Sequence, residues 1–208
     1  MGEFVKIVYR NLEQVVKEAL AYEERAKKAS GDALKVEGFR LMNELKEDLR
    51  QGRAGGSVFS PLTEIAKRMR KPINRKPLSR LAMAVRYSAG LIGGNHAMSV
   101  GFLDANDALT YHKSSANISK SWKRIAQKAQ EGATTPFTED RRRAILSMGV
   151  SLWKKKVPEA KYFFLRSSTK AFKTPPRPII EPFWRAHEAE TERNVLINFE
   201  RKMRGERI

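Results

Sequence analysis

Apolar residues recur every three or four positions in the first fifty residues, which is the period of a helix with one buried face. The pattern predicts a helix over residues 4–29 and a second over about 32–50, with Ser30-Gly31-Asp32 as an interruption. The two segments would form either an antiparallel helix pair or one long broken helix. The apolar face consists of Phe4, Ile7, Val8, Leu12, Val15, Val16, Ala19, Leu20, Leu34, Phe39, Met42, Leu45 and Leu49.

The period changes to two in residues 81–103, which is the pattern of β-strands. Leu81, Met83, Val85 and Tyr87 alternate with smaller or polar residues, and the same alternation returns in residues 97–102. Gly93-Gly94-Asn95 lies between the two segments and is a typical turn sequence. We therefore expect an antiparallel hairpin.

Two further helical patterns occupy residues 119–156. The first stops at Gly132, and residues 133–137 form an extended joint. Thr138 is a favourable N-cap for the second, because its hydroxyl can accept a hydrogen bond from the first turn and acids follow it. Ile145, Leu146, Met148, Leu152 and Trp153 supply the apolar face of that helix. Residues 161–172 are rich in β-favouring side chains and predict a strand.

The C-terminal part begins with a proline-rich arm, residues 174–180, whose prolines favour an extended backbone. A long amphipathic helix is predicted over residues 181–204. Its apolar stripe contains Ile180, Trp184, His187, Thr191, Val195, Phe199 and Met203, with Phe183 and Leu196 beside it. We expect this helix to pack on its own subunit and the arm to contact a neighbour. The expected contact residues are Pro175, Pro176, Arg177, Pro178 and Ile179.

Together these elements predict an α+β fold. It comprises an N-terminal helix pair, a small antiparallel sheet with a hairpin, and a long C-terminal amphipathic helix. The predicted organisation is a helical segment over 1–56, a basic linker over 57–80, and a core over 81–208.

The net charge of +18 is concentrated in the middle of the chain. Residues 61–180 hold 24 Lys and Arg against 7 Asp and Glu, whereas the flanking segments are nearly neutral. Such a field favours nucleic acid or an acidic protein as partner, although a solvated basic surface would give the same composition. The candidate contact residues are Lys67, Arg68, Arg70, Lys71, Arg75, Lys76, Arg141, Arg142 and Arg143.

The sequence offers little chemistry for catalysis. There are no cysteines, which excludes disulfides and thiolate metal sites. Asp104, Asp107 and His112 lie close together in sequence, but their spacing matches no metal-ligand motif, and no phosphate-binding or dinucleotide motif is present. We therefore expect no enzyme activity, no cofactor and no metal. No apolar run is long enough to span a membrane, so synthesis in the cytoplasm is expected.

The order of elements is similar to a family of bacteriophage proteins. A hairpin is followed by Trp122-Lys123-Arg124-Ile125-Ala126-Gln127-Lys128-Ala129-Gln130-Glu131-Gly132, then by the extended Pro-Pro-Arg-Pro-Ile-Ile arm and a terminal amphipathic helix. Over roughly residues 80–208 this resembles the neck and tail-completion proteins of long-tailed phages, including the lambda-type minor tail protein Z. In that family an Arg-Pro segment leads into the last helix, and Arg177-Pro178-Ile179-Ile180 stands at that place.

The resemblance implies a structural protein of the virion neck or tail, made in the host cytoplasm. Such proteins assemble as homo-oligomeric rings that join the head–tail connector to the tail and surround the DNA path. The implied partners are further copies of the chain, connector or portal-side proteins, tail-tube or tail-terminator proteins, and non-specific DNA in the lumen. The alternative from the residues alone is a nucleic-acid-binding protein that uses residues 64–80 and 141–156. A nuclease built on Asp104, Asp107 and His112 is the third hypothesis.

Overall fold

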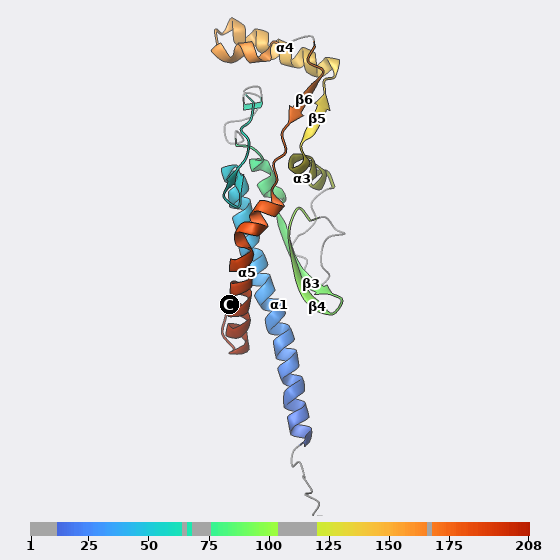
Figure 1. Ribbon diagram of the computed structural model, residues 1–208, viewed down its shortest axis with the longest axis vertical. Helices are drawn as coiled ribbons and strands as arrows, with labels where there is room; N and C mark the ends of the chain where they lie inside the picture. The colour runs from blue at the N-terminus through green and yellow to red at the C-terminus, as the bar shows by residue number, and fades with distance from the viewer. Residues whose placement is uncertain (1–11, 64–65, 68–75, 104–119, 166–167) are drawn as a thin grey trace, which may run out of the picture.

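The computed structural model shows an elongated α+β protein and describes residues 12–63, 66–67, 76–103, 120–165 and 168–208 (Figure 1). Two long helices lie side by side along its axis, and a β-hairpin lies next to them. A second helical unit stands at the opposite end from the free end of the N-terminal helix. The predicted α+β class is confirmed.

Helix α1 runs without interruption from Leu12 to Gln51, so the predicted break at Ser30-Gly31-Asp32 is wrong. One glycine inside a helix costs only about 1 kcal/mol, and packing against the rest of the chain readily offsets that amount. Gly31 is buried, and Asp32 pairs with Lys202 of the C-terminal helix. The N-terminal part is thus one helix rather than a helix pair.

Helix α5, from Ile180 to Met203, lies antiparallel to α1, as ion pairs between the two helices show. Asp32 pairs with Lys202 near one end, and Arg40 pairs with Glu190 further along. The predicted helix and its packing on its own subunit are confirmed. The buried face differs slightly from the predicted apolar stripe. Phe183 and Thr191 are buried, whereas Trp184 is 42% exposed.

The predicted hairpin is present, but its first strand begins later than expected. Strands β3 (Arg86–Ile92) and β4 (Asn95–Gly101) pair antiparallel around the Gly93-Gly94 turn. Residues Ser79–Ala84 form the 3-10 helix η2 instead, because Leu81, Ala82 and Ala84 all turn into the core. Gly38 of α1 faces the ring of Tyr87, where an added Cβ would lie 2.9 Å from the ring, so the hairpin sits directly against α1. A smaller hairpin, β1 (Arg53–Ala54) and β2 (Ser57–Val58), follows α1.

A two-stranded ribbon connects a second unit to the rest of the protein. Helix α3 (Lys120–Glu131) ends at Gly132 as predicted, and strands β5 (Ala133–Pro136) and β6 (Ala171–Thr174) pair antiparallel. The ribbon leads to α4 (Glu139–Lys154) and the 3-10 helix η3 (Pro158–Phe163) (Figure 1). The predicted strand over residues 161–172 is therefore wrong in its first part. Phe163 lies in a helical turn because its side chain is fully buried, and its Cβ and backbone lie against Gly149 of α4.

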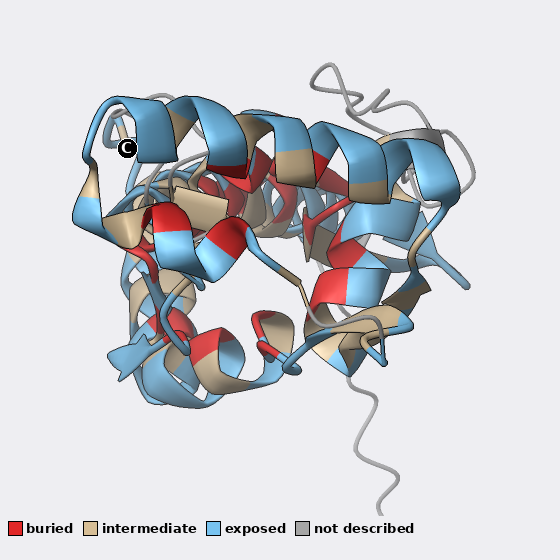
Figure 2. Ribbon diagram, turned by 90° about the horizontal axis from the view of Figure 1, so that it is seen from above, coloured by how far each residue is buried: buried red, intermediate tan, exposed pale blue. Residues whose placement is uncertain are grey.

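The main core joins residues that the sequence had assigned to different segments. Leu41, Leu45 and Leu49 of α1 pack in one cluster with Ile179 and Phe183. Figure 2 shows that the buried residues line the faces that the elements turn towards one another. The α4–η3 unit has a separate small core, made by Ile145, Gly149, Ala160 and Phe163.

Candidate functional site

The proline-rich arm is partly buried in its own subunit. Ile179 is fully buried, and Arg177 is 5% exposed. Pro175, Pro176 and Pro178 remain exposed. Of the five residues predicted to contact a neighbour, only these three prolines present a free face in the structure.

Arg177 connects the arm to two other segments of the chain through hydrogen bonds. Its Nε donates a hydrogen bond to the Ser60 carbonyl at 3.1 Å, and its Nη2 donates to the Pro61 carbonyl at 3.3 Å. Its backbone N–H donates to the Ala129 carbonyl at the end of α3. The side chain therefore fixes the arm between α3 and the segment that follows β2, and this structural role explains why an arginine stands there.

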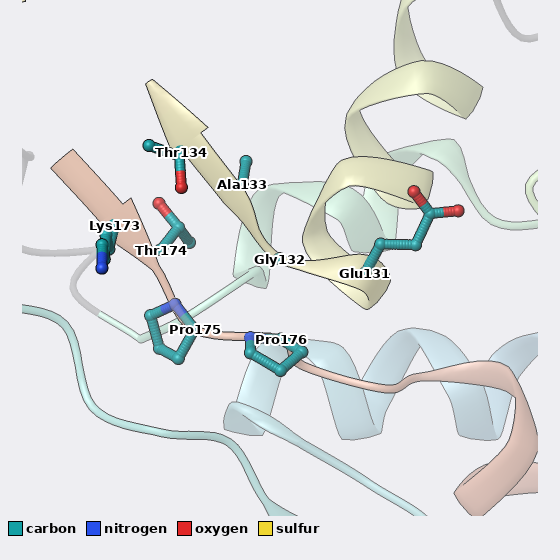
Figure 3. Close-up of a pocket in the computed structure, with 8 residues that line it drawn as sticks. All are labelled: Glu131, Gly132, Ala133, Thr134, Lys173, Thr174, Pro175 and Pro176. Atoms are coloured by element: carbon teal, nitrogen blue, oxygen red, sulfur yellow. The ribbon is translucent and has the colours of Figure 1, made fainter. Parts of the chain in front are cut away.

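The arm passes along the foot of the β5–β6 ribbon, where Figure 3 shows a surface pocket. Gly132 has φ +79° there, and an added Cβ would lie 3.0 Å from the Thr174 carbonyl oxygen and from the Pro176 nitrogen. Thr134 lines the pocket from β5, and Lys173 lines it from β6. The polar side chains that line it, from Glu131, Thr134, Lys173 and Thr174, all belong to exposed residues. We therefore interpret the pocket as a junction of backbone segments rather than a site for chemistry.

The basic linker is described only in part. Lys67 and Lys76 lie in the described residues, half-buried and exposed respectively. Arg68, Arg70, Lys71 and Arg75 lie outside the described residues, as do Asp104, Asp107 and His112. Within the described ranges, no group of three or more His, Asp or Glu side chains could hold a metal ion.

The arginine triplet at the start of α4 does not act as one surface. Thr138 caps the helix as predicted, and its Oγ1 accepts from the Arg141 backbone N–H at 3.3 Å. Arg142 turns inward, because its Nη2 donates to the Thr169 carbonyl at 2.6 Å and its guanidinium lies over Phe137. Arg141 and Arg143 are exposed, so two of the three arginines are available for an external contact.

The other end of α4 carries a cluster that the sequence reasoning missed. Trp153 was assigned to the apolar face of α4, but it is 67% exposed. Its ring meets that of Phe164 edge to face, with centroids 6.1 Å apart, and Tyr162 beside Phe164 is also exposed. The lysine triplet Lys154–Lys156 follows Trp153 directly. The sequence signal that could have indicated this cluster is an aromatic residue next to three cations at the end of a predicted helix.

A polar network spans the α1–α5 interface. His187 Nδ1 lies 3.2 Å from Glu44 Oε2 and 3.7 Å from Glu190 Oε2. Arg40 pairs with both of these glutamates and with the buried Glu37. The hydrogen bond to Glu37 raises the pKa of the Arg40 guanidinium further above its usual range. Arg40 thus stays charged and holds the register of the two helices. His187, which the sequence places on the apolar stripe of the C-terminal helix, belongs to this structural network.

Comparison with known proteins returns no matching family model, no similar curated protein and no similar solved structure. Among the described residues, no helix has the length and apolarity needed to cross a membrane.

Proposed function

We propose that the chain is a structural virion protein of the phage neck or tail-completion type, which assembles as a ring through its projecting N-terminal helix. The ring would join the connector to the tail and surround the DNA path. The sequence resemblance over residues 80–208 supports the family. One structural observation supports self-assembly, namely an apolar helix face that is covered along half of α1 and uncovered along the other half.

The face of α1 that packs in the core continues beyond the core. Leu41, Leu45 and Leu49 are buried on this face. Leu20 lies 25 residues before Leu45, which is about seven turns at 3.6 residues a turn, so it points in the same direction. Yet Leu20 is 59% exposed, and Val16 on the same face is 50% exposed. The covered part of α1 begins near Ala29, where α5 ends alongside it.

The uncovered part is a projecting rod. Residues 12–28 extend about 25 Å at 1.5 Å a residue, and Figure 1 shows them running past the end of α5. A rod that repeats the apolar face of a packed helix is suited to receive a helix from a neighbouring subunit.

The charge of the rod favours a second copy of the chain as that neighbour. Residues 12–28 contain four basic and four acidic side chains and have no net charge. Copies of a chain with net charge +18 repel each other wherever their basic segments meet. The neutral rod is therefore a surface where two copies can approach with little repulsion, and ring assembly should strengthen as salt screens the remaining charge.

The experiment measures mass in solution by light scattering after size exclusion, at 50 and 300 mM salt, for three proteins. The wild type should form one closed species of more than two copies, favoured by the higher salt. Leu20→Lys should shift it to monomer, because the substitution places a charge on the apolar face. Tyr22→Lys is the matched control, since Tyr22 is 58% exposed on the same helix but lies about 200° round from Leu20.

Three results would contradict the proposal. They are a wild type that stays monomeric at high concentration and high salt, a species of only two copies, and a Leu20→Lys variant with the mass of the wild type. Circular dichroism and thermal melting of both variants verify that the monomer fold is intact, as expected for residues that are exposed within the subunit.

A further inference from the structure

Three aromatic side chains are exposed on the α4–η3 unit, and two of them, Trp153 and Phe164, meet edge to face. Trp153 is 67% exposed, Phe164 45% and Tyr162 44%. They are not needed for the small core of this unit, which Ile145 and Phe163 fill from the inner side. Single exposed rings are common on protein surfaces, whereas rings that contact each other on one exposed patch are a feature of binding surfaces.

Lysines lie next to these rings in the sequence. Lys154, Lys155, Lys156 and Lys161 are all exposed, and Lys161 Nζ lies 5.4 Å from the centroid of the Tyr162 ring. Glu159 is the only acid between residues 153 and 165. Rings flanked by a surplus of cations fit a partner that offers flat apolar faces and negative charge together.

The backbone conformation at Lys156 also supports a role for its charge. Lys156 has φ +53°, a left-handed conformation that favours glycine. Its N–H donates to the Trp153 carbonyl and the Val157 N–H donates to the Leu152 carbonyl, which is the usual hydrogen bonding of a glycine-terminated helix. A glycine would end the helix with less strain, so backbone preference does not account for the lysine. The helix dipole accounts for a cation at Lys154 and Lys155 in the last turn, but does not require one at the strained position.

We propose that Trp153, Tyr162 and Phe164, with Lys154–Lys156 and Lys161, form a binding surface for single-stranded nucleic acid. Unpaired bases stack on the rings, and the lysines contact the phosphates. Duplex nucleic acid keeps its bases stacked on one another and offers only its phosphates to this surface. The site is separate from the rod of α1, and it goes beyond the assembly role proposed above.

The test uses the whole 208-residue chain and a fluorescein-labelled 20-nucleotide oligothymidylate, and binding is followed by fluorescence anisotropy at 50 mM salt. The wild type should bind saturably, and more tightly than it binds a 20-base-pair duplex. Trp153→Ala should weaken binding roughly tenfold, the scale expected for one stacked base. Trp184→Ala is the matched control, because Trp184 is an exposed tryptophan on α5, outside this surface, and its removal should leave the affinity unchanged.

A second variant separates binding from folding. Lys156→Gly should weaken binding and lower the slope of log affinity against log salt by about 0.7, the amount expected for one lost phosphate contact on a single strand. Its melting temperature should stay the same or rise, because glycine relieves the left-handed strain. The proposal is overturned if Trp153→Ala binds like Trp184→Ala, if the duplex binds as tightly as the single strand, or if Lys156→Gly leaves both affinity and salt slope unchanged.

Discussion

Replacing Arg177 by methionine should destabilise the monomer, because the side chain holds the proline-rich arm in place from inside the subunit. Methionine keeps an unbranched stem of similar length but cannot donate the hydrogen bonds to the Ser60 and Pro61 carbonyls. The hydrogen bond from the Arg177 backbone N–H to Ala129 is unaffected by the change. The substitution thus isolates the contribution of the guanidinium.

The size of the effect follows from the environment of the two acceptors. A hydrogen bond from a charged donor contributes about 1.5–3 kcal/mol when its acceptor would otherwise stay buried and unpaired. Ser60 and Pro61 are exposed residues, so water can replace the guanidinium at their carbonyls. Removing a buried cation also recovers part of its desolvation cost. We therefore expect a net loss of about 2 kcal/mol for both bonds together.

The assay is thermal unfolding followed by circular dichroism, with urea unfolding as a second measurement. A loss of about 2 kcal/mol lowers the melting temperature of a chain of this size by about 4–8 °C. Arg185→Met is the control for the same chemical change on the surface. The Arg185 side chain is 76% exposed, and its pair with Glu181 should contribute less than about 0.5 kcal/mol.

Two outcomes would refute this reasoning. If Arg177→Met is as stable as the wild type, the hydrogen bonds only balance the cost of burying the cation. If the variant keeps monomer stability but loses assembled mass in light scattering, Arg177 acts on a neighbouring subunit, as the sequence alone had predicted.

Two further predictions concern single positions. Burial by itself would raise the pKa of Asp32, but Lys35 at 2.8 Å and Lys202 at 3.4 Å outweigh it and hold that pKa below its ordinary value. The carboxylate therefore stabilises the fold above its unfolded-state pKa of about 3.9, and this contribution is lost as the pH falls through the lower folded-state pKa. Asp32→Asn should be less stable than the wild type at pH 7 in urea unfolding, and the difference should shrink towards pH 3; an equal difference at both pH values would contradict the assignment. Gly132→Ala should lower the free energy of unfolding by about 1–3 kcal/mol in the same assay, because alanine is strained at φ +79° and its Cβ meets backbone atoms at 3.0 Å. An unchanged urea midpoint would show that the junction between α3 and the arm can shift.

Much of the local structure could be predicted because the signals are themselves local. Gly132 ends α3, Thr138 caps α4, and Gly93-Gly94 turns the hairpin, each through the backbone preferences of one or two residues. The same reasoning failed at Gly31, where packing of α1 against α5 outweighs a small helix penalty. It also failed at Phe163, whose burial against α4 outweighs its strand preference.

The candidate sites depend more on tertiary structure than the elements do. The sequence gives the number and order of the arginines, but burial separates Arg177 and Arg142, which are bound inside the subunit, from the exposed Arg141 and Arg143. Sequence periodicity likewise assigns Trp153 to a buried face of α4, whereas the short η3 leaves that tryptophan uncovered.

The sequence by itself determined the α+β class, the antiparallel hairpin, the terminal helix and the uneven distribution of charge. These follow from residue type and spacing, which act over a few positions. Only the tertiary structure decided that α1 is one helix, that the arm is anchored by Arg177, and that Leu20 and Trp153 stand exposed. The physical reason is that the free energy of burying a side chain depends on which distant segment covers it, and an apolar pattern is the same whether or not that cover is present.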